Sequence, residues 1–176
     1  DVVDVLHSAA DRIGDVEARV ALCRRVAALC QERLGEPERA LFYAERAATL
    51  APHDARAVAT LADALLAVGR TADALPVLER ALGHDPSFLE AHVSRTHALA
   101  VLRRWSEAES AARDALALHP GEPRLTGNLA ACHIETGRAR GAVDLLRAAR
   151  EERPNDPHIA TALAQACTYA DGLSAE

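Results

Sequence analysis

The chain has 176 residues and 49% hydrophobic side chains, enough for one domain with a sizeable core. Its formal charge at pH 7 is −6, and its basic residues are all arginine. An acidic chain lacks the basic surface that binds nucleic acids and anionic membranes, so we expect neither as a partner. Arginine without lysine, beside abundant alanine, is typical of a GC-rich genome and indicates a bacterial source.

The first predicted element is an amphipathic helix over residues 1–13, with Leu6, Ala10 and Ile13 on its apolar face. Gly14 interrupts this pattern. Asp15 follows as a suitable N-cap for a second, longer helix over about residues 16–33.

Beyond this point the sequence repeats every 34 residues. Proline returns at that step, as do two alanine positions and one glycine position, at which Arg103 replaces the third glycine. The recurring residues are Pro52, Pro86, Pro120 and Pro154; Ala40, Ala74, Ala108 and Ala142; Ala47, Ala81, Ala115 and Ala149; and Gly35, Gly69 and Gly137. A fixed period of this length predicts similar structural units that stack on one another.

Each unit is predicted to contain two helices, A and B. In the unit that starts at residue 55, Val58, Ala62 and Leu65 recur at helical spacing, and Gly69 ends helix A. Helix B runs on to Pro86, because proline cannot continue a helix. Two short helices joined by a short turn favour an antiparallel hairpin.

These units resemble the tetratricopeptide repeat, whose 34-residue motif has aromatic and leucine positions in helix A and ends in a proline. The resemblance implies an all-α fold in which antiparallel helix hairpins stack as a right-handed α-solenoid. It implies a single array over residues 1–176, with full repeats at 21–54, 55–88, 89–122 and 123–156. Residues 1–14 then form helix B of a truncated preceding repeat, and residues 157–170 a terminal helix A.

The aromatic positions of the motif are mostly lost in this chain. The first of them holds Arg24, Val58, His92 and Thr126. We therefore expect each repeat to pack less firmly than in an idealised array.

The terminal helix is predicted to carry apolar residues on more than one face. Ile159, Ala162 and Ala166 lie off the face that carries Ala160, Leu163, Ala164 and Cys167. A natural cap has a polar outer face, so the array is expected to continue in a longer protein or to pack on another chain through this end.

The resemblance also implies a partner-binding groove lined by the A helices. The residues carried over to it from the family are Arg25, Arg56, Thr60, Asp63, Ser94, His97, Arg124, Asn128 and Gln165. The same family positions also hold Val26, Leu29, Glu90, Ala131, His158, Thr161 and Ala162. Short polar side chains can pair with the backbone of an extended peptide, and arginine can bind a carboxylate. The alternative is that these residues are only the solvated face of exposed helices.

One subclass of the family binds chaperone C-termini through a clamp of lysine, asparagine and arginine residues. The best overlay of this clamp falls on Arg25, Leu29, Thr60, Glu90 and Ser94. These residues do not supply the required side chains, so the sequence does not support a chaperone clamp.

No catalytic motif is present, and we expect no enzyme activity, no cofactor and no metal. Cys23 and Cys30 lie seven residues apart on one predicted helix, too far apart for a common ligand set. We interpret the four cysteines as buried reduced thiols of a cytoplasmic protein.

The predicted function is a protein–protein interaction scaffold that binds a peptide or protein partner in the groove. Two alternatives stay open at this point. The chain is a regulatory or scaffolding segment of a larger enzyme or regulator, or it is a self-assembly module that forms a homo-oligomer through its terminal helices.

Overall fold

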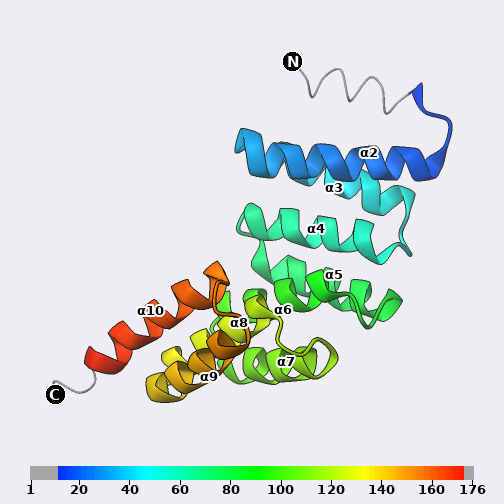
Figure 1. Cartoon of the computed structure of the whole chain (residues 1–176). Helices are drawn as coiled ribbons and strands as arrows, with labels where there is room; N and C mark the ends of the chain where they lie inside the picture. The colour runs from blue at the N-terminus through cyan, green and yellow to red at the C-terminus, as the bar shows by residue number, and fades with distance from the viewer. Residues whose placement is uncertain (1–11, 173–176) are drawn as a thin grey trace. The chain divides into compact units, whose positions relative to one another are not determined.

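A computed structural model describes residues 12–172 of the chain, and in this range every regular element is a helix (Figure 1). The helix predicted over residues 1–13 lies almost entirely outside the described residues and stays a prediction. The chain divides into two compact units, Asp1–Ala91 and His92–Glu176, which we describe separately.

Unit 1 is a stack of helices in which each one packs on the next. It contains α2 (Val16–Leu29), the π-helical turn η1 (Cys30–Leu34), α3 (Pro37–Leu50), α4 (Ala55–Ala67) and α5 (Thr71–His84). The Asp15 carboxylate caps α2 by accepting a 3.0 Å hydrogen bond from the backbone N–H of Ala18, as the sequence predicts.

Unit 2 repeats this arrangement. It contains most of α6 (Leu89–Val101), in which the boundary between the units falls, then α7 (Trp105–Leu118), α8 (Pro123–Glu135), α9 (Ala139–Glu152) and α10 (Pro157–Gly172). Helix α8 contacts α7, α9 and α10, and α9 contacts α10. The predicted all-α fold of stacked helix hairpins is therefore confirmed.

The recurring alanines form the centre of both units. Ala40, Ala74, Ala108 and Ala142 have no exposed surface, and neither have Ala47, Ala81 and Ala115. A methyl side chain lets two helix backbones approach closely, and larger apolar residues such as Leu78, Leu125 and Leu146 fill the space between these contacts. Alanine at this spacing is thus a packing requirement of the fold.

The prediction of which residues share a face of the last helix is wrong. Ile159, Leu163 and Ala166 are buried together, whereas Ala160 and Ala164 are exposed. The buried residues follow a spacing of four and three, so they lie on one face of α10, and that face packs on α8 and α9. Alanine occurs on both buried and exposed faces of helices. Its positions in the sequence therefore do not identify the buried face of α10.

The turns between helices A and B use a left-handed residue. Gly35, Gly69 and Gly137 have φ angles of 65°, 78° and 77°, and Arg103 has a φ of 57° at the equivalent place. The next residue closes the same hydrogen bond in three of these turns: Arg70 N–H donates to Leu65 O and Arg104 N–H to Leu99 O, both at 2.9 Å, and Arg138 N–H donates to His133 O at 2.7 Å. Arg103 thus adopts a backbone conformation that favours glycine.

We expect Arg103→Gly to raise the free energy of unfolding by about 1 kcal/mol, because the left-handed conformation costs a residue with a Cβ roughly that amount. Urea denaturation of the full chain measures the change. Gly137→Ala is the matched control, since an added Cβ there meets no atom within 4 Å and only the backbone strain remains. The control should lose a similar amount; an unchanged stability in both variants would contradict the explanation.

Candidate binding groove

In unit 1 the predicted groove residues lie on two helices. Arg25 is exposed on α2; Arg56 is exposed on α4, where Thr60 and Asp63 are half-buried. The Thr60 hydroxyl donates a 2.8 Å hydrogen bond to Arg56 O and accepts one of 3.4 Å from Arg24 Nε. Thr60 therefore links α2 and α4.

Val26 does not line a groove. It is buried, with 1% of its surface exposed, although its family position predicts a groove residue. Its apolar side chain is stabilised in the interior of unit 1. The family position is thus a poor guide where the side chain is apolar.

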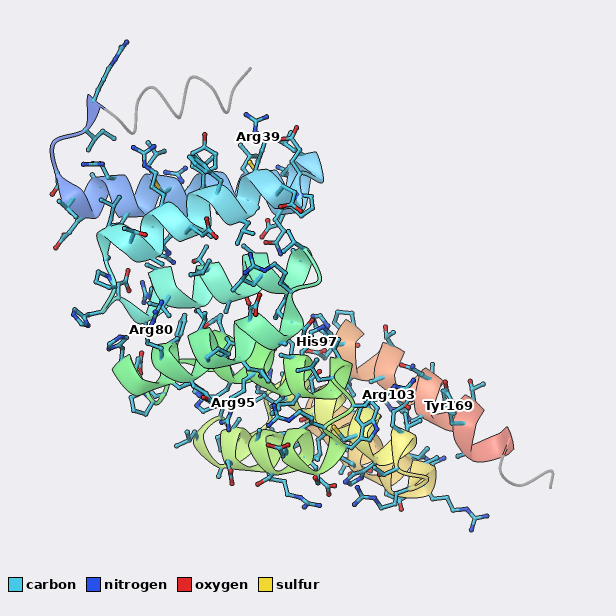
Figure 2. The ribbon with its side chains drawn as sticks, turned by 180° about the vertical axis from the view of Figure 1, so that it is seen from behind. Arg39, Arg80, Arg95, His97, Arg103 and Tyr169 are labelled. Carbon is cyan, nitrogen blue, oxygen red and sulfur yellow. The ribbon has the colours of Figure 1, made fainter. Side chains whose placement is uncertain are left out.

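Unit 2 contains an open groove with a volume of about 430 Å³, and four of the nine predicted partner-binding residues line it. His97 comes from α6, Arg124 and Asn128 from α8, and Gln165 from α10. Figure 2 shows His97 near the first turns of α10. Ser94 is half-buried on α6 and is not among the lining residues.

The remaining lining residues are mostly small or apolar. They are Val93, Pro123, Gly127, Ala131, His158, Thr161 and Ala162. Val93, Pro123 and Gly127 are absent from the sequence prediction. The sequence does contain a signal for Gly127. A glycine in the middle of a predicted helix destabilises that helix, so its presence there indicates a packing or functional role.

Asn128 is fixed by contacts with α6. Its Nδ2 donates hydrogen bonds to Thr96 Oγ1 at 2.7 Å and to Val93 O at 3.3 Å. Both amide hydrogens are therefore used, and among the described residues only Oδ1 of this side chain is left to accept a bond from a partner. Asn128 both joins two helices and offers the groove an acceptor.

The groove contains few charged groups. Its lining residues include one arginine and two histidines and no Asp or Glu. The nearest carboxylates along the chain are engaged locally: Glu122 binds Arg124 Nε at 2.8 Å, and Asp156 accepts a 2.9 Å bond from the backbone N–H of His158. The charge of Arg124 is therefore offset by the neighbouring carboxylate of Glu122.

A second polar cluster lies outside the groove and connects α7 with α8 and the turn before α9. Glu109 accepts hydrogen bonds from both terminal nitrogens of Arg138, and it also pairs with Arg113. His133 Nε2 lies 3.4 Å from Glu109 Oε1. The hydrogen bonds from Arg138 lower the pKa of Glu109 to about 2, while burial and then the charge of Arg138 lower the pKa of His133.

The cysteines show no sign of nucleophilic chemistry. Cys23, Cys30 and Cys132 are buried and Cys167 is half-buried, all as free thiols. Burial raises the pKa of the Cys30 and Cys132 thiols, which disfavours the reactive thiolate.

In the described part of the chain no His, Cys, Asp or Glu residues gather in a group that could hold a metal ion. Between residues 12 and 172, no helix combines the length and the hydropathy that a membrane span requires.

The stacked hairpins place the chain among the α-solenoid repeat proteins. The family model for the tetratricopeptide repeat matches residues 33–100 and 102–166, which is more than half of the chain. The chain therefore belongs to the tetratricopeptide repeat (TPR) family. None of the curated proteins compared with it matches.

Solved structures of similar fold include TTC0263, a thermophilic TPR protein of Thermus thermophilus. It is 23% identical with a TM-score of 0.73, over 95% of this chain and 96% of that one. MamA from Desulfovibrio magneticus RS-1, residues 41 to the end, is 20% identical with a TM-score of 0.70, over 90% and 87% of the two chains. At these identities the likeness shows the fold alone. In general, this fold is that of a protein-interaction scaffold.

Proposed function

We propose that the chain is a protein–protein interaction scaffold that holds a peptide or protein segment in the groove between α6, α8 and α10. The observation that carries this proposal is the composition of the groove. Polar groups of His97, Arg124, Asn128 and Gln165 surround small residues at Gly127, Ala131 and Ala162. Polar side chains above such a surface are suited to a chain that contributes its own backbone.

We also propose the surface formed by Arg25, Arg56, Thr60 and Asp63 in unit 1 as a partner-binding surface in its own right. Its exposed arginines can bind carboxylates of a partner. Free cysteines that are mostly buried support the proposal that the protein works in a reducing compartment, the bacterial cytoplasm. We assign it neither a catalytic role nor a cofactor.

The proposal predicts that blocking the groove abolishes peptide binding. A phage-displayed library of random twelve-residue peptides is selected on the full chain, and the enriched peptides are measured by fluorescence anisotropy. We expect Ala131→Gln to weaken their binding at least tenfold, because Ala131 is an exposed lining residue and glutamine occupies the groove.

Ala164→Gln is the matched control for this experiment. Ala164 is an exposed alanine of α10 that is not among the lining residues, so the same substitution there should leave affinity unchanged. Enriched peptides that bind both variants as well as the wild type would show that the groove is not the site.

A further inference from the structure

We propose that His133 makes the contact between α7, α8 and the start of α9 sensitive to acid, so that this part of unit 2 opens locally in mildly acidic solution. The device is the polar cluster of Glu109, Arg113, His133 and Arg138, whose residues do not line the groove. It is a conformational property of the fold, and it stands or falls independently of the proposed function.

The His133 ring is enclosed and lacks hydrogen-bond partners. Its side chain is 15% exposed, and both ring nitrogens are buried without a hydrogen bond. Nε2 lies 3.4 Å from Glu109 Oε1 but forms no hydrogen bond with it. On the α9 side of the ring, a Cβ at Gly141 would lie 3.6 Å from Nδ1. A neutral imidazole carries one N–H and the protonated ring carries two, so protonation adds a buried donor without an acceptor.

Positive charges already surround this ring. Arg113 belongs to α7 and Arg138 to the turn before α9, and both bind the Glu109 carboxylate. Among the described residues Glu109 is the one carboxylate that acts on His133, and Arg138 uses both of its oxygens. Helix α9 presents the uncharged Gly141, and no charged group of α10 acts on the ring in the part of the chain that the structure describes. The folded cluster therefore disfavours a third cation at His133.

Burial, followed by the charge of Arg138, lowers the pKa of His133 below its ordinary value of 6.5, although Glu109 acts in the opposite direction. A histidine with a lowered pKa binds fewer protons in the folded state than in an opened one. The contact is then most stable above pH 6.5 and loses stability as the pH falls from there toward the folded pKa. Acid thus favours a conformation in which the ring reaches water.

The elements that enclose the ring meet at one end of the α8–α9 hairpin. His133 lies in the last turn of α8, and Gly141 lies in the first turn of α9. Helix ends open at a lower free energy than the core of a domain. An opening confined to this end exposes the ring, while Leu125 and Leu146 in the core of unit 2 stay buried.

Cys132 can report this opening. Its thiol is free and it is 1% exposed in the folded chain. It lies close enough to the cluster for the charges of Glu109 and Arg138 to act on its pKa. A thiol reagent therefore reaches Cys132 only when the cluster opens.

The test labels the full chain with a pyridyl disulfide reagent at pH 7.5 and pH 5.5, and mass spectrometry of peptides gives the rate at each cysteine. Each rate is divided by that of glutathione at the same pH, which removes the ordinary effect of pH on the reaction. When labelling is slow compared with closing, the rate follows the population of the open form. We expect the relative rate at Cys132 to rise severalfold at pH 5.5, and the rates at Cys23 and Cys30 in unit 1 to stay unchanged. An equal rise at all three thiols would mean that the whole chain unfolds and would overturn a local opening.

His133→Gln removes the titrating group and keeps a polar side chain. The rise at Cys132 should disappear in this variant whatever its overall stability, because the readout is the ratio between the two pH values. His119→Gln is the matched control, since His119 follows the last residue of α7 and its Nε2 is also buried without a hydrogen bond. The control should keep the rise. A rise that survives in His133→Gln, or that disappears in His119→Gln, would overturn the role of His133.

Hydrogen exchange of the wild type tests the opening without any variant. After correction for the intrinsic pH dependence of amide exchange, the first turn of α9 should lose protection at pH 5.5, whereas α4 in unit 1 should not. Equal protection of the first turn of α9 at both pH values would overturn the proposed opening.

Discussion

Glu109→Gln should destabilise the protein by about 1–3 kcal/mol at pH 7, the amount expected when a hydrogen-bonded charge is removed from a well-covered ion pair. The Glu109 side chain is only 12% exposed and it binds Arg138 of the α8–α9 turn and Arg113 of α7. Glutamine keeps the shape but donates through its nitrogen, which faces an arginine. Urea denaturation of the full chain at pH 7 measures the loss.

Glu109→Gln should also change the pH dependence of the unfolding free energy. The folded pKa of Glu109 is about 2 and lies below its ordinary value of 4.5. A depressed carboxyl pKa contributes stability that is complete above about pH 4.5 and is lost as the pH falls toward 2. The difference in unfolding free energy between the wild type and Glu109→Gln should therefore stay constant down to about pH 4.5 and narrow as the pH falls from there toward 2.

Glu107→Gln is the matched control on the same helix. Glu107 also pairs with an arginine, Arg104 at 2.6 Å, but both side chains are about half exposed. Hydrogen bonds from Arg104 lower its pKa too. Solvent screens such an exposed pair, so its removal should change stability little. Equal losses in the two variants would show that the cluster around Glu109 has no special role.

Much of the fold is predictable from the sequence because its signals are local and recur. Proline and glycine end helices for reasons of backbone geometry that do not depend on tertiary contacts. Arg103 shows how strongly the 34-residue period determines the backbone conformation. Its position in the period predicts a glycine-like turn, and the chain adopts the left-handed conformation there without a glycine.

The groove is less predictable, because the sequence does not show how neighbouring helices use each polar group. The family positions bring His97, Arg124, Asn128 and Gln165 to one groove. They do not reveal that Asn128 donates its amide hydrogens to residues of α6. Nor do they show that Thr60 accepts a hydrogen bond from Arg24. Such contacts depend on side-chain conformations across helices more than 30 residues apart.

The period alone also hides differences in burial between equivalent positions. Ala115 in α7 and Ala149 in α9 are one period apart and unrelated to the groove. Ala115 has no exposed surface, whereas Ala149 is half-buried near the end of its helix. The repeat makes Ala115 and Ala149 equivalent packing positions. The structure predicts that a larger side chain is tolerated at Ala149 but not at Ala115.

Ala115→Leu should therefore destabilise the protein by about 1–3 kcal/mol, because three added carbon atoms force helix α7 away from its neighbours. Ala149→Leu should change stability by no more than about 0.5 kcal/mol, since its side chain can extend into solvent. Leucine is a good helix former, so helix propensity does not separate the two variants. Thermal and urea unfolding of both measure the difference. Equal destabilisation would mean that α9 is covered at Ala149 as closely as α7 is at Ala115, for example by another copy of the chain.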